Sequence, residues 1–101
     1  MITHEEALEM IQASVSSLTR AGLIAHDVSV QEDTVLLGRG SPLDSIAFVT
    51  FVTELEERLS REANRELFLV LQDIQDYEAD NPYLTAGSMA RYLCRLTVQS
   101  S

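Results

Sequence analysis

Ser45 is the residue of this sequence that is best placed for chemistry. It follows a Gly-containing turn at residues 38–41, begins a long amphipathic run that continues to Leu59, and has Asp44 directly before it. This order predicts an exposed hydroxyl group at the start of a helix. A serine nucleophile needs a base, but both histidines precede Ser45 and no G-x-S-x-G elbow is present. These residues favour Ser45 as a point of covalent attachment over a self-contained catalytic serine.

Capping is the simpler interpretation of the same two residues. Serine is a favoured N-cap, and a serine before an apolar helical run commonly serves only that purpose. Asp44 has the same alternative, as a cap or as a partner of the helix dipole. The local sequence leaves both interpretations open.

The composition is acidic and otherwise that of a globular domain. The 101 residues carry 7 Lys and Arg against 16 Asp and Glu, which gives a formal net charge of −9 at pH 7. This charge argues against nucleic acid and against an anionic membrane surface as partners. It favours a basic protein partner whose approach is steered by charge, although acidity that only maintains solubility is the alternative.

The remaining sequence signals are mostly exclusions. Cys94 is the only cysteine, so no intrachain disulfide is expected, and His4 and His26 have no partners at metal-ligand spacing. Cys94 is interpreted as a small core residue. Neither a signal peptide nor an apolar stretch long enough for a membrane span is apparent. We expect one cytoplasmic, monomeric domain over residues 1–101, with a frayed tail from about residue 97.

Helical periodicity predicts a first helix after Thr3. Thr3 and Glu6 have the spacing of a capping box, and Arg20 to Gly22 read as a stop. The expected buried face comprises Leu8, Ile11, Val15 and Leu18. The connection over residues 23–44 contains many apolar side chains, so we expect an ordered crossing, with at most a short helical turn.

A second helix is predicted from about Ser45 to Ser60. Its expected core face comprises Phe48, Val52, Leu55 and Leu59, with Phe51 beside them. Ile46 and Val49 are apolar at positions that the pattern leaves half exposed. They either widen the core stripe or form a contact patch for partners.

Residues 62–80 are ambiguous because the run from Leu67 to Leu71 fits a helical stripe or a short buried strand. The absence of another strand-like segment favours helix. A last helix is predicted from about Thr85, an N-cap residue, and its expected apolar face comprises Ala86, Met89, Leu93 and Leu96. The predicted fold is therefore all-α, a small bundle of three to four helices with a long first loop.

Three parts of the chain resemble acyl carrier proteins, including their peptidyl and aminoacyl relatives. They are the turn leading into Leu43-Asp44-Ser45-Ile46, the acidic helix end at residues 54–59, and the closing stretch at residues 84–93. The closing stretch is similar to the family's Thr-x-x-Ser-hydrophobic-Ala-x-Tyr ending. The chain departs from the family in two ways. It has Ala47, Thr50 and Thr53 in the first half of the second helix, where family members often carry acids, and it has roughly a dozen additional residues near 62–73.

The resemblance implies a carrier that is not itself an enzyme. Ser45 would carry 4′-phosphopantetheine, derived from CoA, and hold an acyl, aminoacyl or peptidyl group as a thioester. Asp44 would be read by the phosphopantetheinyl transferase. Partner enzymes of fatty-acid, polyketide or related biosynthesis, with basic docking surfaces, would face Ile46, Val49, Glu56 and Glu57.

Two alternatives accompany this interpretation. In the first alternative, the chain is an unmodified helical adaptor of the same fold that acts through its acidic surface. The apolar run at residues 67–71 is either additional core or a cleft for the attached acyl chain, lined by Leu67, Phe68 and Leu71.

Overall fold

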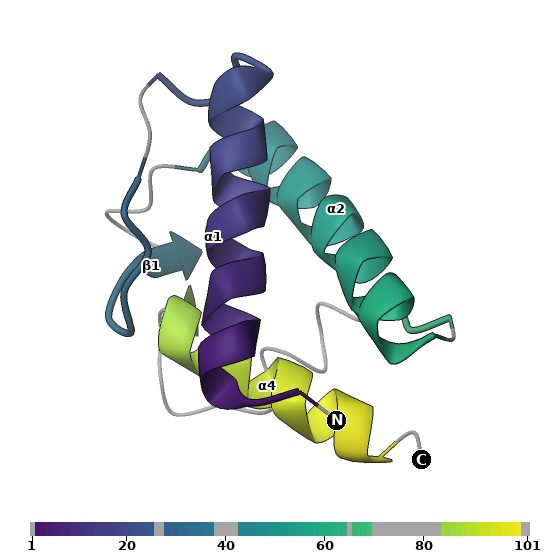
Figure 1. The fold of residues 1–101 in the computed structure, drawn as a ribbon. Helices are drawn as coiled ribbons and strands as arrows, with labels where there is room; N and C mark the ends of the chain where they lie inside the picture. Colours follow the sequence, from purple (N-terminus) through teal and green to yellow (C-terminus); the bar gives the residue numbers. More distant parts are fainter. Residues whose placement is uncertain (1, 26–27, 38–42, 65, 70–83, 100–101) are drawn as a thin grey trace.

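The computed structural model describes residues 2–25, 28–37, 43–64, 66–69 and 84–99 (Figure 1). This part of the chain is mostly helical, as predicted. Its helices are α1 (His4–Arg20), α2 (Ser45–Ala63) and α4 (Ala86–Gln99), and its strands are β1 (Val35–Leu37) and β2 (Leu84–Thr85). Helix α1 packs against both α2 and α4, so it is the central element of the fold.

Both ends of α1 follow the sequence signals. The Thr3 hydroxyl accepts the Glu6 N–H at 3.1 Å, and the Glu6 carboxylate accepts the Thr3 N–H at 3.0 Å, which completes the predicted capping box. The helix ends at Arg20, and Gly22 follows with φ +81°, a conformation that glycine adopts without strain.

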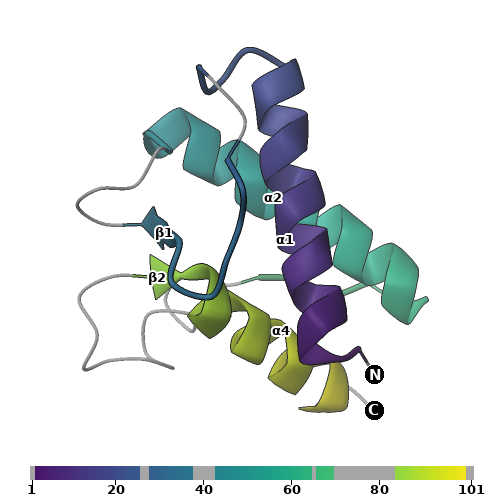
Figure 2. The same ribbon diagram turned by 60° about the vertical axis from the view of Figure 1, so that its left-hand side comes forward.

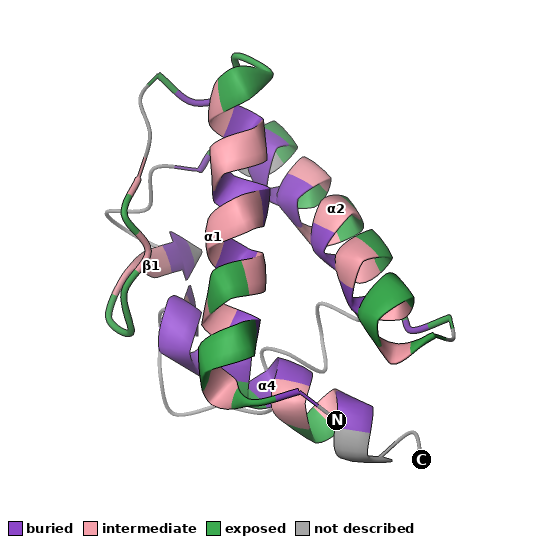
Figure 3. Ribbon diagram, viewed as in Figure 1, coloured by how far each residue is buried: buried purple, intermediate pink, exposed green. Residues whose placement is uncertain are grey.

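Helix α2 begins where it was predicted and continues three residues further, to Ala63. It ends at Asn64, which has the left-handed backbone (φ 57°) that asparagine tolerates. The side chains expected in the core are buried except for Val52, which is half-buried. Figure 3 shows α1 and α2 with their buried stripes turned toward one another and their exposed residues outward.

The connection between α1 and α2 is ordered over residues 28–34, as expected. Gln12 of α1 holds it: its amide nitrogen donates to the Val28 carbonyl at 2.9 Å, and its amide oxygen accepts the Val30 N–H at 2.7 Å. Strand β1 follows at residues 35–37. Residues 26–27 and 38–42, which include His26 and the Gly-containing turn, lie outside the described residues.

A two-stranded sheet corrects the expectation of a fold without paired strands. Strands β1 and β2 are antiparallel, with Val35 opposite Thr85 and Leu37 opposite Leu84 (Figure 2). The pairing joins segments far apart in the sequence and only two or three residues long, too short to give a periodic signal. It positions the buried side chains of Leu36 and Leu84 beside the core.

The segment 66–69 is another correction, because it is not helical. Leu67 and Leu69 are buried whereas Phe68 is 65% exposed, the alternation of an extended chain. Helix α2 holds this segment through two side chains: Ser60 Oγ accepts the Leu67 N–H at 2.9 Å, and Glu56 Oε2 accepts the Leu69 N–H at 2.7 Å. The helical prediction for residues 70–80, including Leu71, lies outside the described residues.

Backbone carbonyls of the segment 32–34 accept the first N–H groups of α4. Ala86 N–H donates to the Thr34 carbonyl at 2.8 Å, and Gly87 N–H donates to the Glu32 carbonyl at 2.9 Å. Thr85 Oγ1 accepts the Ser88 N–H at 3.2 Å, as predicted for an N-cap. The helix continues through Gln99, and Thr97 is buried.

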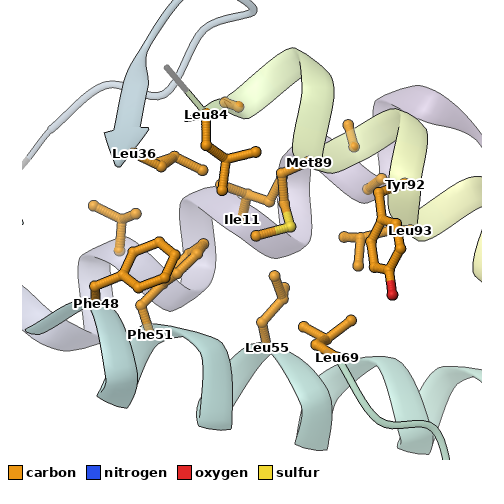
Figure 4. Close-up of a cluster of buried hydrophobic side chains, with 14 of the residues drawn as sticks. Ile11, Leu36, Phe48, Phe51, Leu55, Leu69, Leu84, Met89, Tyr92 and Leu93 are labelled. Carbon is orange, nitrogen blue, oxygen red and sulfur yellow. The ribbon is translucent and has the colours of Figure 1, made fainter. Parts of the chain in front are cut away.

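The three helices share one hydrophobic core. In Figure 4, Phe48, Phe51 and Leu55 of α2 point toward Ile11 of α1 and Met89 of α4. The rings of Phe48 and Phe51 are tilted by 39° with centroids 6.0 Å apart. The shared core keeps α2 fixed against α1 and leaves its opposite side toward solvent.

Candidate functional site

Ser45 is the first residue of α2, but it is not the cap of that helix. The N-cap is Asp44, whose Oδ1 accepts the Ala47 N–H at 2.8 Å and whose backbone oxygen accepts the Phe48 N–H at 2.8 Å. Capping therefore accounts for Asp44 and does not account for Ser45. The predicted exposure of the Ser45 side chain lies outside what the structure describes.

Asp44 is exposed as well as being the cap. Its carboxylate lies at the positive end of the α2 dipole, which favours a negative charge there. The prediction that Asp44 caps the helix is thus confirmed. The same residue also presents a carboxylate on the surface next to Ser45 in the sequence. A second role for Asp44 in recognition remains a prediction.

Ile46 and Val49 do not widen the core stripe. Ile46 is 70% exposed and Val49 is 60% exposed, although both belong to the helix that supplies Phe48 and Phe51 to the core. Isolated apolar residues on a surface are ordinary, but these two are one helical turn apart and immediately follow Ser45. Their role as a contact patch for partners stays a prediction.

A shallow hollow extends from Val49 along α2, lined by Val49, Thr50, Thr53, Glu54 and Glu57. Three of the side chains that line it are bonded within α2. The hydroxyls of Thr50 and Thr53 donate to the carbonyls one turn earlier, each at 3.0 Å, and Glu54 pairs with Arg58 at 3.2 Å. Glu57 is exposed, whereas Glu54 is half-buried and its carboxylate is paired with Arg58.

Glu56 and Glu57, both predicted to face partners, differ in their surroundings. Glu56 is half-buried and accepts the Leu69 N–H, so it has a structural task in holding the segment 66–69. Glu57 is exposed beside the hollow. Of the two acids, Glu57 is better placed to meet a partner.

Ser60 and the outward direction of Phe68 were not predicted from the sequence. A second hollow runs between α2 and the segment 66–69, lined by Thr53, Glu56, Glu57, Ser60, Arg61, Glu66, Leu67 and Phe68. All three residues of Leu67, Phe68 and Leu69 are apolar, so the alternation of their burial has no counterpart in the sequence pattern.

Among the described residues, the other titratable candidates are His4 and Cys94, which lie away from Ser45 in the sequence. His4 is paired with Glu32, whose other carboxylate oxygen lies 3.8 Å from Arg91. Cys94 is half-buried against the core; burial raises the pKa of its thiol above the ordinary 9.0, and the charge of Glu6 raises it further. These groups are accounted for by packing and pairing.

Within the described residues, no group of three or more His, Cys, Asp or Glu side chains is arranged to hold a metal ion. The described helices include none that is sufficiently long and apolar to cross a membrane. Comparisons of the chain with protein-family models, with curated proteins and with solved structures found no match.

Proposed function

We propose that the chain is a carrier protein in which Ser45 receives a 4′-phosphopantetheine arm and presents a thioester-bound acyl, aminoacyl or peptidyl group to partner enzymes. The observation that carries the proposal is the position of Ser45. It is the first residue of α2, it follows an exposed capping carboxylate, and exposed Ile46 and Val49 come after it. The sequence resemblance to acyl carrier proteins at residues 43–46 and 84–93 is the reason to assign phosphopantetheine attachment to this serine.

The start of α2 is a suitable place for a phosphodiester. The first backbone N–H groups of a helix have no partner within the helix, and the dipole is positive at this end. In α2 the Asp44 side chain accepts one of these groups, the Ala47 N–H. A negative phosphodiester on Ser45 would gain about 0.3–1 kcal/mol from that end when exposed to solvent. This interaction is too small to bind the arm tightly, and it would favour one direction for its base.

The attachment reaction requires only a hydroxyl group from this chain. Ser45 Oγ attacks the phosphorus bonded to pantetheine in CoA, the pyrophosphate bond breaks, and adenosine 3′,5′-bisphosphate leaves. The hydroxyl proton passes to a base of the transferase. The product is a phosphodiester, and no oxidant or reductant is involved.

Intact-protein mass spectrometry tests the proposal. The purified chain is incubated with CoA, Mg²⁺ and a broad-specificity phosphopantetheinyl transferase, together with an established carrier as a positive control. We expect one added phosphopantetheine, which Ser45→Ala abolishes and which Ser29→Ala, a change at an exposed serine in the first connection, retains.

The adaptor interpretation gives a different outcome in the same experiment. An unmodified wild-type chain beside a fully modified control carrier would reject the carrier proposal and favour an adaptor that acts through its acidic surface. Modification that persists in Ser45→Ala would reject Ser45 as the site.

A further inference from the structure

Phe68 is the third large apolar side chain exposed in the described part of the chain, and it does not belong to α2. Its ring is 65% exposed while both of its neighbours are buried. Leu67 is fixed to Ser60 through its N–H and its carbonyl, at 2.9 and 3.2 Å, and Leu69 is fixed to Glu56. The backbone on either side of Phe68 is thus anchored, so the ring is presented outward from a fixed position.

The surface around Phe68 is continuous with the surface beside Ser45. The two hollows along α2 share Thr53 and Glu57, one reaching back to Val49 and the other forward to Phe68. Ile46, Val49, Thr53 and Glu57 follow one another at helical steps of three and four, so they lie on one side of α2. We name this surface, from Ile46 through Val49, Thr53 and Glu57 to Phe68, the α2 face.

We propose that the transferase that modifies Ser45 docks along the entire α2 face and seats the Phe68 ring in an apolar pocket of its own surface. This inference rests on the carrier function proposed above. It assigns to the segment 66–69 a role in partner recognition that the sequence did not suggest.

The dimensions of the α2 face suit a single partner. Helix α2 has 19 residues and is therefore about 28 Å long. A standard protein interface covers about 800 Å² of each partner, which corresponds to a patch roughly 30 Å across. An enzyme that reaches Ser45 at one end of α2 can consequently contact Phe68 near the other.

The charges around Phe68 and the anchored backbone of the segment 66–69 indicate what kind of partner docks on the α2 face. The hollow beside Phe68 is lined by three carboxylates, from Glu56, Glu57 and Glu66, and by one cation, from Arg61. This excess favours a basic partner, whereas a second copy of a chain with net charge −9 would be repelled. An aromatic side chain on a backbone that is already anchored loses less conformational freedom on docking than one on a free loop, and aromatic residues are enriched among interface hot spots.

Steady-state kinetics of the same transferase test this inference. With CoA and Mg²⁺ present, Phe68→Ser is expected to lower kcat/KM for the carrier about tenfold, through KM with kcat unchanged, the scale of one hot-spot side chain. Phe68→Leu is expected to retain most of the wild-type value. Glu57→Lys should lower kcat/KM, and Glu5→Lys, which reverses an exposed acid on α1, should not.

Circular dichroism and thermal unfolding establish that each variant is folded. A folded Phe68→Ser chain with kcat/KM within about twofold of wild type would overturn the inference while leaving the Ser45 assignment intact. Concentration-dependent dimerisation that Phe68→Ser removes would make a second copy the occupant instead, and would also overturn it. Failure of the wild-type chain to be modified would overturn both proposals.

Discussion

The carboxylate of Glu56 accepts the backbone N–H of Leu69 at 2.7 Å, and this bond joins α2 to a segment that has no regular secondary structure of its own. The acid that sequence reasoning placed at a partner interface is thereby part of the framework. Glu57, the next residue, is exposed.

Glu56→Ala should destabilise the fold, because it leaves the Leu69 N–H without its acceptor in a partly buried site. We expect a loss of about 1–2 kcal/mol in the free energy of unfolding, measured by urea denaturation. Glu57→Ala is the matched control and should change stability by less than about 0.5 kcal/mol. Equal effects of the two substitutions would contradict the assignment of Glu56 to the framework.

Gln12→Ala should release the connection between α1 and α2. Gln12 bonds both Val28 and Val30, so its loss removes an acceptor from the Val30 N–H. Hydrogen exchange should show faster exchange of the Val30 amide, and stability should fall by about 1–3 kcal/mol. Gln31→Ala alters an exposed glutamine of the same connection and should leave this amide unchanged.

Gly87→Ala should be poorly tolerated. A Cβ atom at this position would lie 2.9 Å from the Glu32 carbonyl oxygen and closer still to its carboxylate. The segment 32–34 would have to move away from the start of α4, at a cost of about 1–3 kcal/mol in thermal or urea unfolding. Gly22→Asn is the control, since its site is open and asparagine accepts a left-handed backbone. A neutral Gly87→Ala would contradict a close contact between Gly87 and Glu32.

The capping box of α1 should contribute a pH-dependent part of the stability. Hydrogen bonds from the backbone and the hydroxyl of Thr3 hold the pKa of Glu6 below its ordinary value of 4.5. Because the folded-state pKa is lowered, this contribution is present above pH 4.5 and is lost as the pH falls through the folded-state pKa.

Glu6→Gln tests this dependence because glutamine keeps the capping box without the charge. The Tm of the wild-type chain should exceed that of Glu6→Gln at pH 7, and the difference should vanish at low pH. Glu5→Gln, which lies in the same turn outside the capping box, is the control. A Tm difference that is the same at both pH values would contradict this account.

Substitutions of Asp44 should separate its capping from its charge. Asp44→Ala removes the oxygen that accepts the Ala47 N–H and should cost about 0.5–2 kcal/mol in unfolding experiments. Asp44→Asn retains a capping oxygen and should be nearly as stable as the wild type. If the transferase reads the carboxylate, Asp44→Asn will nevertheless be modified more slowly at Ser45; an unchanged rate would restrict Asp44 to its role as a cap.

The helices could be predicted because their signals are local. The Thr3 and Glu6 capping box, the stop near Gly22 and the spacing of Phe48, Leu55 and Leu59 each act within a few residues, so periodicity and capping revealed them. The pairing of β1 with β2 joins segments that are far apart in the sequence. The extended path of Leu67 to Leu69 depends on side chains of α2 that accept its backbone N–H groups, and hydrophobic periodicity does not encode either kind of contact.

By itself, the sequence determined that Ser45 begins a helix, that Asp44 is available to cap it, and that the chain is strongly acidic. Tertiary structure decided which side chains of that helix are covered. Packing of α1 on α2 buries Phe48 and Phe51 and leaves Ile46 and Val49 outside, and the anchored segment 66–69 turns Phe68 outward. Burial is a property of the assembled core, so it follows from where neighbouring elements pack and not from the residues of one helix alone.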